Sequence, residues 1–206
     1  MRLFPAAPGL TVAFVLGLGG CSNFSEPTMP HYRRNPHPQQ RYEVTLRLDD
    51  APGPVLSLEG AAQYEVADLS CVPELPGSGV RPVPRQTLPV TYLRTAMNSY
   101  VLTVHSDAMR DEDYHGLGVC RWKLVALHVA LHLADRQHRD IAIDPTLTGE
   151  ALLSGRTSTA HFWRDGRPRV NPQDAVALDY QGPRRYREDI RADVFSVTFI
   201  PRTATP

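Results

Sequence analysis

The chain has 206 residues, 42% of them hydrophobic, which is enough for one domain with a sizeable core. Lysine and arginine together number 22, as do aspartate and glutamate, so the chain lacks the excess of basic charge typical of nucleic-acid-binding proteins. The 19 prolines and 14 glycines indicate many turns and few long helices.

Residues 1–20 have the pattern of an export signal. Arg2 supplies a short basic start, and residues 10–18 form an apolar stretch followed by glycines. The stretch is too short and too often interrupted by glycine to be a good membrane span. We therefore expect this leader to be removed from the mature protein.

The leader ends in Leu18-Gly19-Gly20-Cys21, which resembles the lipobox of bacterial lipoproteins. The resemblance implies that the leader is cut before Cys21 and that acyl chains such as palmitate are attached to this cysteine. The alternative is an ordinary signal peptide with an incidental cysteine. Several acyl chains would anchor the protein stably. Ser22 follows, where aspartate would resemble an inner-membrane retention signal, so we expect the periplasmic face of the outer membrane, with the inner membrane as the alternative.

Residues 21–41 are expected to form the lipidated N-terminus and a flexible, proline-rich tether. They are rich in Pro, Asn, Gln and Ser and offer little to bury. The basic residues of this stretch leave two interpretations open. It is either a solvated linker or a contact with lipid head groups or peptidoglycan.

Residues 42–206 are expected to form a single domain built of strands, because short stretches alternate apolar and polar residues between turn residues. The predicted strands cover residues 42–48, 55–58, 62–66, 90–93, 99–105, 117–133, 141–143, 146–153, 158–163, 175–180 and 194–200. Residues 73–89 are a Pro/Gly-rich connection that no regular element should cross, and residues 182–193 are one helical turn or a solvated loop. The pattern predicts an all-β fold, an antiparallel β-sandwich of about 8–10 strands with one disulfide and little helix.

The stretch 117–133 is the longest apolar run outside the leader, and we predict that it is the central strand. From Val125 onward, large apolar residues occupy alternate positions, whereas before it Cys120, Trp122 and Leu124 form the apolar set. The inward-facing set therefore changes phase near Leu124–Val125. A β-bulge, or a strand that passes between two sheets, would produce this change.

Of the three cysteines, two remain once Cys21 is acylated. Cys71 and Cys120 are then the possible disulfide pair, in a compartment that oxidises thiols. A bridge would close a loop of about 50 residues and stabilise the domain by about 4 kcal/mol in the chain-entropy model. Two buried free thiols, or a reactive cysteine, are the alternatives. Trp122, on the same strand face as Cys120, is expected to pack beside the bridge.

His128 and His132 have the spacing of a helical zinc site, but they lie in the predicted strand. Four strand positions span about 13 Å, which is too far for two side chains to share one ion. Val129 also stands where the glutamate of His-Glu-x-x-His would be. We therefore predict no metal site and no cofactor, and we expect both histidines on the wetter face of the sheet.

The best candidate for a partner-binding loop is the acidic segment before the central strand. Its candidate residues are Asp107, Met109, Asp111, Glu112, Asp113, Tyr114 and His115. Carboxylates can steer a partner electrostatically, and methionine and tyrosine offer apolar contact area. A solvated hairpin loop and a cation site are the alternatives, although the spacing does not match an EF-hand.

No catalytic motif stands out in the sequence, since Leu152-Leu153-Ser154-Gly155 lacks the first glycine of a nucleophile elbow. The ten residues 113–122 are similar to a stretch in small periplasmic lipoproteins of Gram-negative bacteria, some of which are encoded beside antibacterial effectors and look like immunity proteins. The resemblance implies a non-enzymatic protein that binds a protein partner, such as a type VI phospholipase effector. A structural or assembly lipoprotein and a hydrolase with a dispersed active site are the alternatives, and nucleic acid is not an expected partner.

Overall fold

The computed structural model describes residues 30–134, 137, 140–164, 182, 184 and 186–203. The leader, Cys21 and the strand predicted at residues 175–180 lie outside this part of the chain. Within it, none of the helices is long and apolar enough to cross a membrane.

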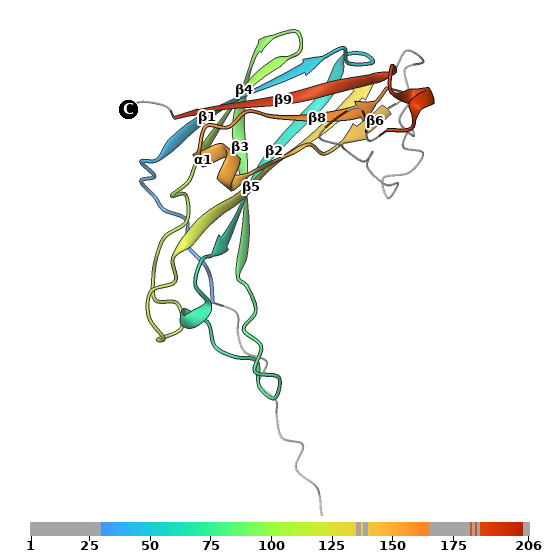
Figure 1. Cartoon of the computed structure of the whole chain (residues 1–206). Helices are drawn as coiled ribbons and strands as arrows, with labels where there is room; N and C mark the ends of the chain where they lie inside the picture. Colours follow the sequence, from blue (N-terminus) through green and yellow to red (C-terminus); the bar gives the residue numbers. More distant parts are fainter. Residues whose placement is uncertain are drawn as a thin grey trace, which may run out of the picture.

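The described part of the chain forms nine strands, and every pair of neighbours is antiparallel. The strands are β1 (Arg41–Asp49), β2 (Val55–Val66), β3 (Arg85–Ala96), β4 (Ser99–His105), β5 (Trp122–Ala134), β6 (Asp140–Ile143), β7 (Thr146–Thr148), β8 (Ser158–Trp163) and β9 (Val194–Thr203). Their order is β6-β5-β2-β3-β4-β1-β9-β8, with β7 beside β5. The predicted all-β antiparallel fold is confirmed (Figure 1).

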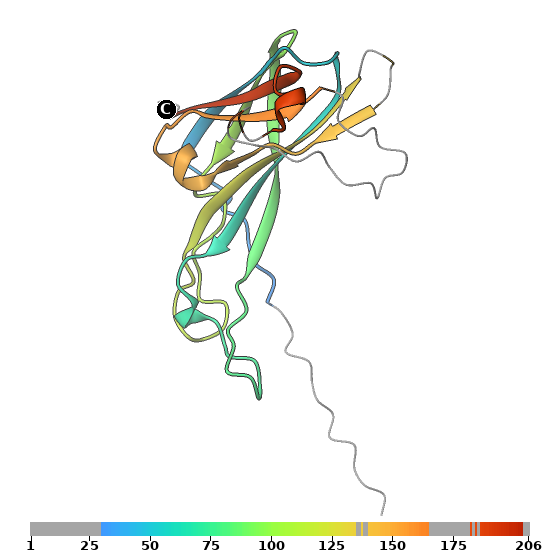
Figure 2. The same cartoon turned by 45° about the vertical axis from the view of Figure 1, so that its right-hand side comes forward.

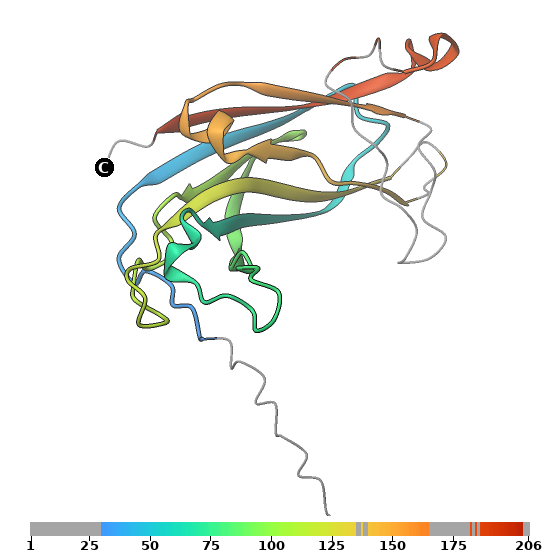
Figure 3. The same cartoon turned by 60° about the horizontal axis from the view of Figure 1, so that its bottom comes forward.

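Strand β3 connects two sheets. Its first half, Arg85–Val90, pairs with β2, and its second half, Thr91–Ala96, pairs with β4. One sheet therefore contains β6, β7, β5, β2 and β3, and the other contains β3, β4, β1, β9 and β8. The two sheets curve around one core and form a nearly closed structure (Figure 3).

Strand β5 carries the bulge that its sequence indicated. In the pairing with β2, Gln63 lies opposite Ala126 and Tyr64 lies opposite Leu124, so Val125 is an extra residue on β5. The extra residue shifts the inward-facing set by one position, which confirms the predicted phase change. The other explanation considered for the phase change, a strand that passes between two sheets, applies to β3 and not to β5.

Strand β5 is also shorter than predicted, because it begins at Trp122. Gly116 and Gly118 have φ angles of 72° and 109°, and positive φ values interrupt a regular strand. Residues 117–121, which were predicted to belong to the strand, therefore remain in a loop, where Leu117 and Val119 are exposed to solvent.

Two stretches predicted to be irregular belong to strands. Strand β2 is continuous through residues 59–61 because main-chain pairing with β3 and β5 holds it on both sides. Strand β3 begins inside the expected connection 73–89 and contains Pro89. Proline is tolerated there because this half of β3 pairs with β2 alone among the described residues.

Residues 146–153 are half strand and half helix. After β7, the hydroxyl of Thr148 accepts a hydrogen bond from the N–H of Ala151 (3.3 Å) and caps the short helix α1 (Gly149–Leu153). The described residues of 182–193 include the 3-10 turn η3 (Glu188–Ile190). Another 3-10 turn, η1 (Leu69–Cys71), follows β2.

The core lies between the two sheets. Inward-facing residues of β1 (Val44, Leu46 and Leu48) are buried, as the alternation predicted. Helix α1 connects β7 to β8 and contacts β1, β5 and β9, so it covers the side where the sheets do not meet. Its Leu152 is part of the core.

The molecule has two distinct ends. Residues 30–40, 67–84 and 106–121 lie together at one of them, which we call the disulfide end (Figures 1 and 2). The β3–β4 hairpin, which turns at Met97 and Asn98, stands at the other. Strand β3 runs from the first end to the second.

Candidate functional site

A disulfide joins two loops of the disulfide end. Cys71 in η1 and Cys120 before β5 are bonded, with 5.3 Å between their Cα atoms. Val66, Val72 and Trp122 pack around the bridge. The predicted pairing and the position of Trp122 beside it are both confirmed, and neither cysteine is a free thiol.

The segment 30–40 packs on the domain, although the sequence indicated a flexible tether. The ring of Tyr32 meets those of Tyr114 and Trp122 edge to face, at centroid distances of 5.0 and 5.1 Å. The main chain of Asn35 donates to the carbonyl of Ala108 (2.8 Å). Composition did not reveal this because the aromatic residues that receive Tyr32 are about 80 to 90 positions away in the sequence.

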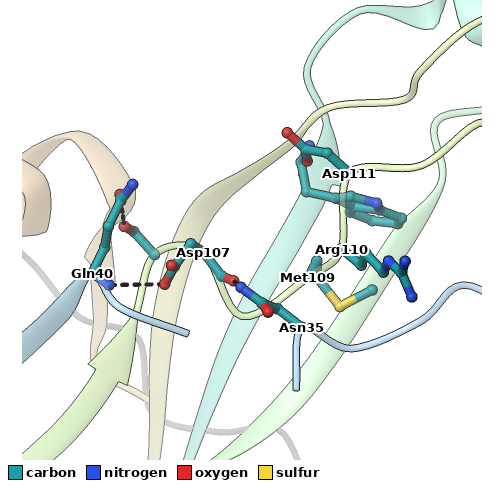
Figure 4. A pocket seen from close by; sticks show the side chains of 8 residues that line it. Asn35, Gln40, Asp107, Met109, Arg110 and Asp111 are labelled. Atoms are coloured by element: carbon teal, nitrogen blue, oxygen red, sulfur yellow. Dashed lines mark hydrogen bonds between the residues drawn. The ribbon is translucent and has the colours of Figure 1, made fainter. Parts of the chain in front are cut away.

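Asp107 fixes the chain where it enters β1. Its carboxylate accepts hydrogen bonds from the main-chain N–H groups of Gln39 (2.8 Å) and Gln40 (3.1 Å). Its carbonyl accepts another from the side-chain amide of Asn35 (2.9 Å). Figure 4 shows Gln40, Asp107 and Asn35 facing one another. Asp107 therefore holds the end of segment 30–40 against the acidic segment.

The next two acidic residues also have partners within the fold. Asp111 accepts a hydrogen bond from the main-chain N–H of Trp122 (2.9 Å), which fixes the start of β5. Glu112 forms an ion pair with Arg33 (3.2 Å) and lies 3.9 Å from the guanidinium of Arg110. Both residues connect the acidic segment to its neighbours in the fold.

Asp113 caps its own loop. One of its oxygens accepts hydrogen bonds from the N–H groups of His115, Gly116 and Leu117, at 3.2, 2.7 and 3.2 Å. Desolvation alone would raise the pKa of this carboxyl, but the backbone N–H groups outweigh it and hold the pKa below its usual value. The carboxylate is thus stabilised in its charged form by the loop that it organises.

The structure brings the remaining candidates together but directs them inward. Met109 is only 4% exposed, so the expectation that it offers apolar area to a partner is wrong. Tyr114 donates to the carbonyl of Arg110 (2.6 Å), and His115 lies 3.5 Å from the hydroxyl of Tyr32. The acidic segment therefore joins segment 30–40 to β5.

A hollow of about 340 Å³ lies between these segments (Figure 4). It is lined by Asn35, Gln40, Ser106, Asp107, Met109, Arg110, Asp111 and Trp122. The carboxylates of Asp107 and Asp111, which could receive a ligand, already accept main-chain N–H groups. A ligand in the hollow would have to compete with these hydrogen bonds.

The two histidines lie half-buried on the outer face of β5, as predicted. His128 lies within hydrogen-bonding distance of Gln63 on β2 (3.2 Å) and Thr146 on β7 (3.0 Å). His132 contacts Asp140 on β6 (2.9 Å). The residues that the structure describes contain no group of three or more His, Cys, Asp or Glu side chains arranged to hold a metal.

The sequence predicted strands at residues 90–93 and 99–105, which belong to the β3–β4 hairpin, but not how exposed β3 is. Leu93 and Met97 are 68% and 76% exposed, and every residue of β3 from Thr91 to Ala96 is exposed. Pairing with β2 ends at Val90, so the edge of β3 that faced β2 has no strand partner beyond it among the described residues. One sequence signal was available. Tyr92 and Leu93 are adjacent, and neighbouring strand residues point to opposite faces, so both cannot face the core.

No protein-family model, curated protein or solved structure matches this chain. Its function therefore has to be inferred from its own residues and their geometry. In the described part, most of the acidic segment serves the fold. The large exposed apolar side chains gather mainly at the β3–β4 hairpin and in the loops of the disulfide end.

Proposed function

We propose that this protein is a lipid-anchored domain of the bacterial cell envelope that acts by binding another protein, with the β3–β4 hairpin as its recognition surface. Cys21 is the proposed acylated residue because it ends a lipobox-like sequence. The proposed location is the periplasmic face of the outer membrane. The observation that carries the binding role is the exposed edge of β3 from Thr91 to Ala96, together with Leu93 and Met97.

An exposed strand edge favours contact with a protein. Unpaired main-chain N–H and C=O groups can pair with an extended segment of a partner, and alternate side chains then add specificity. Exposed apolar side chains add contact area. Arg94 stiffens the hairpin, because its guanidinium donates to the carbonyls of Ala96 (3.2 Å) and Met97 (2.8 Å).

The direction of β3 argues against a second copy of the chain as the partner. The strand runs away from the disulfide end, where Arg85 pairs with Glu65, toward the hairpin tip. Antiparallel pairing, the more stable arrangement of two such edges, would point the two domains in opposite directions. Two copies anchored in one membrane point the same way. The proposed partner is therefore a different protein that reaches the hairpin from the periplasm.

The kind of partner follows from the resemblance of residues 113–122 to immunity-type lipoproteins. We propose a secreted antibacterial effector that this protein binds and inhibits. The binding role depends on the hairpin, whereas this choice of partner depends on the resemblance, so the two parts can be tested separately.

The test uses the native lipoprotein in cells. A photo-crosslinking amino acid at position 93 should capture a protein that the same amino acid at position 153 does not, since Leu153 is exposed on α1, away from the hairpin. With the captured protein purified, Leu93→Asp and Met97→Asp should each weaken binding about tenfold or more, equivalent to about 1.4 kcal/mol. Leu153→Asp, the matched control, should leave the affinity unchanged. Equal affinity for all three variants would show that recognition lies elsewhere.

If the partner is an effector, cells that make it should survive with the native lipoprotein and die with Leu93→Asp. If cells survived with both proteins, inhibition of the effector would not depend on binding through the hairpin.

A further inference from the structure

The disulfide end exposes apolar side chains on two loops. They are Leu75, Val80 and Val83 in the loop after η1, and Leu117 and Val119 in the loop before β5. The bridge between Cys71 and Cys120 joins the bases of these loops. Figures 1 and 2 show both loops at the same end of the molecule.

Both loops are held in shape by polar contacts, so their apolar residues do not fold back on the domain. In the first loop, the guanidinium of Arg81 donates to the carbonyls of Leu69 (3.1 Å) and Val72 (2.8 Å). The N–H of Leu75 donates to the carbonyl of Val80 (2.8 Å) and closes a turn. In the second loop, the carboxylate of Asp113 holds three N–H groups.

The chain enters the domain at this end. Pro30 is the first described residue, and Tyr32 packs between Tyr114 and Trp122. Eight residues, 22–29, lie between Cys21, the proposed anchor, and Pro30. A chain of this length spans at most about 30 Å even when fully extended. With acyl chains on Cys21, the disulfide end is therefore the part of the domain closest to the membrane.

We propose that the two loops rest on the membrane that holds the anchor and insert Leu75, Val80, Leu117 and Val119 into its interface. This inference rests on the proposed lipid anchor. The three segments of this end carry five arginines and six carboxylates, so their charges nearly balance, and some of them form ion pairs, such as Arg33 with Glu112 and Arg81 with Glu74. Burial of apolar side chains, rather than attraction to anionic head groups, therefore drives the contact, and it does not weaken with salt.

The test uses the full-length lipidated protein in vesicles of phosphatidylethanolamine and phosphatidylglycerol, with no other protein present. Leu117→Cys and Leu93→Cys variants are labelled with an environment-sensitive fluorophore, and lipids with a quencher on the acyl chain are added. The probe at position 117 should shift its emission to the blue and be quenched, and the probe at position 93, at the opposite end, should show neither change.

A second measurement avoids the label. In the unmodified protein on vesicles, main-chain hydrogen exchange at residues 75–83 and 114–119 should slow about tenfold or more relative to the protein in detergent, while residues 91–98 are unchanged. The inference is overturned if the protection from hydrogen exchange disappears at high salt. It is also overturned if the probe at position 117 shows the emission of a solvent-exposed fluorophore. Flotation of the same samples with the vesicles distinguishes the two proposals. Protein that floats with both loops in water refutes the loop contact alone, whereas protein that does not float refutes the anchor.

Discussion

At the scale of single residues, Asp107 shows how much of the acidic segment serves the fold. Its carboxylate holds two consecutive N–H groups at the entry to β1, and its carbonyl holds the side chain of Asn35. Pairing of β1 with β4 begins at Arg41 and His105, and the carboxylate extends the main-chain contacts to the two residues before β1. The charge pattern, which suggested recognition, thus has a structural role here.

Asp107→Ala should therefore destabilise the domain. The two N–H groups of Gln39 and Gln40 would lose their acceptor, which costs about 1–2 kcal/mol of unfolding free energy. Asp107→Asn, which keeps one acceptor oxygen, should lose less. Urea unfolding of the three proteins gives the comparison. Equal stability of the alanine variant and the native protein would contradict the role assigned to this carboxylate.

Tyr64 should make stability depend on alkaline pH. Its buried hydroxyl donates to the carbonyl of His105 (2.6 Å). Burial raises the pKa of this phenol above its usual value, and repulsion by Asp107 raises it further. A raised pKa in the folded state means that the stability is fully present below the unfolded value of about 10 and is lost as pH rises above it.

Tyr64→Phe should cost about 1 kcal/mol at neutral pH, because the His105 carbonyl loses its donor. The same variant should lose less stability than the native protein between neutral pH and pH values above about 10. Unfolding by urea across this range measures both effects. Burial also raises the pKa of Tyr32, so Tyr32→Phe is the control for the contribution of another phenol. If the unfolding free energy of Tyr64→Phe fell with rising pH as steeply as that of the native protein, the pH dependence would come from other groups.

At the scale of elements, α1 and the bulge of β5 fit closely together. A Cβ atom added to Gly149, the first residue of α1, would meet the main-chain carbonyl of Leu124 and the carbonyl carbon of Val125. Main-chain atoms cannot move aside as a flexible side chain can. Glycine is therefore required where α1 crosses the bulge, and the two features fix each other's position.

Gly149→Ala should push α1 away from β5 and lower the unfolding free energy by about 2 kcal/mol or more. Gly182→Ala makes the same chemical change where no atom of the described residues lies within 4 Å, so it should be close to neutral. Thermal unfolding of the two variants provides the test. A neutral Gly149→Ala would show that the helix can shift without cost.

The elements that could be predicted from sequence are those with local signals. Alternation located β1, β4 and most of β5, and the change of phase at Val125 located the bulge. The disulfide followed from there being two candidate cysteines. The path of β3 through Pro89 could not be predicted, because it depends on pairing with β2, about 25 residues earlier.

The candidate surfaces were less predictable than the fold. Composition identified the acidic segment but could not show that its carboxylates bind main-chain N–H groups contributed by residues far away, such as Gln39 and Gln40. The docking of Tyr32 likewise depends on distant aromatic residues. The exposed edge of β3 exists because β2 and β3 separate after Val90, which is a property of the three-dimensional path.

At the scale of the whole molecule, the two ends have complementary roles in our proposals. We propose that the disulfide end faces the membrane and that the hairpin faces the periplasm. Strand β3 begins near one end and finishes at the other, and β2 and β5 pair along much of the distance between them. This arrangement requires a domain that stays rigid between its ends.

The disulfide is the covalent part of that rigidity, and removing it should weaken the entire domain. Cys71 and Cys120 are 49 residues apart in sequence, and the loop that they close contains β3 and β4. In the chain-entropy model such a bridge stabilises the folded state by about 4 kcal/mol. That is a large share of the roughly 5–15 kcal/mol typical of a domain. A double Cys71→Ala and Cys120→Ala variant should therefore unfold at a much lower denaturant concentration than the native protein.

The native protein in reductant is the matched control, because it loses the bridge without a change of sequence. It should unfold at the same denaturant concentration as the double variant. Two outcomes are distinguishable by limited proteolysis in parallel with denaturation. A global role predicts earlier unfolding of the core strands along with the loops. If cleavage increased only in residues 67–84 and 106–121 while the midpoint of global unfolding stayed the same, the bridge would hold the loops of the disulfide end alone. The domain would then owe its stability to the packing between the two sheets.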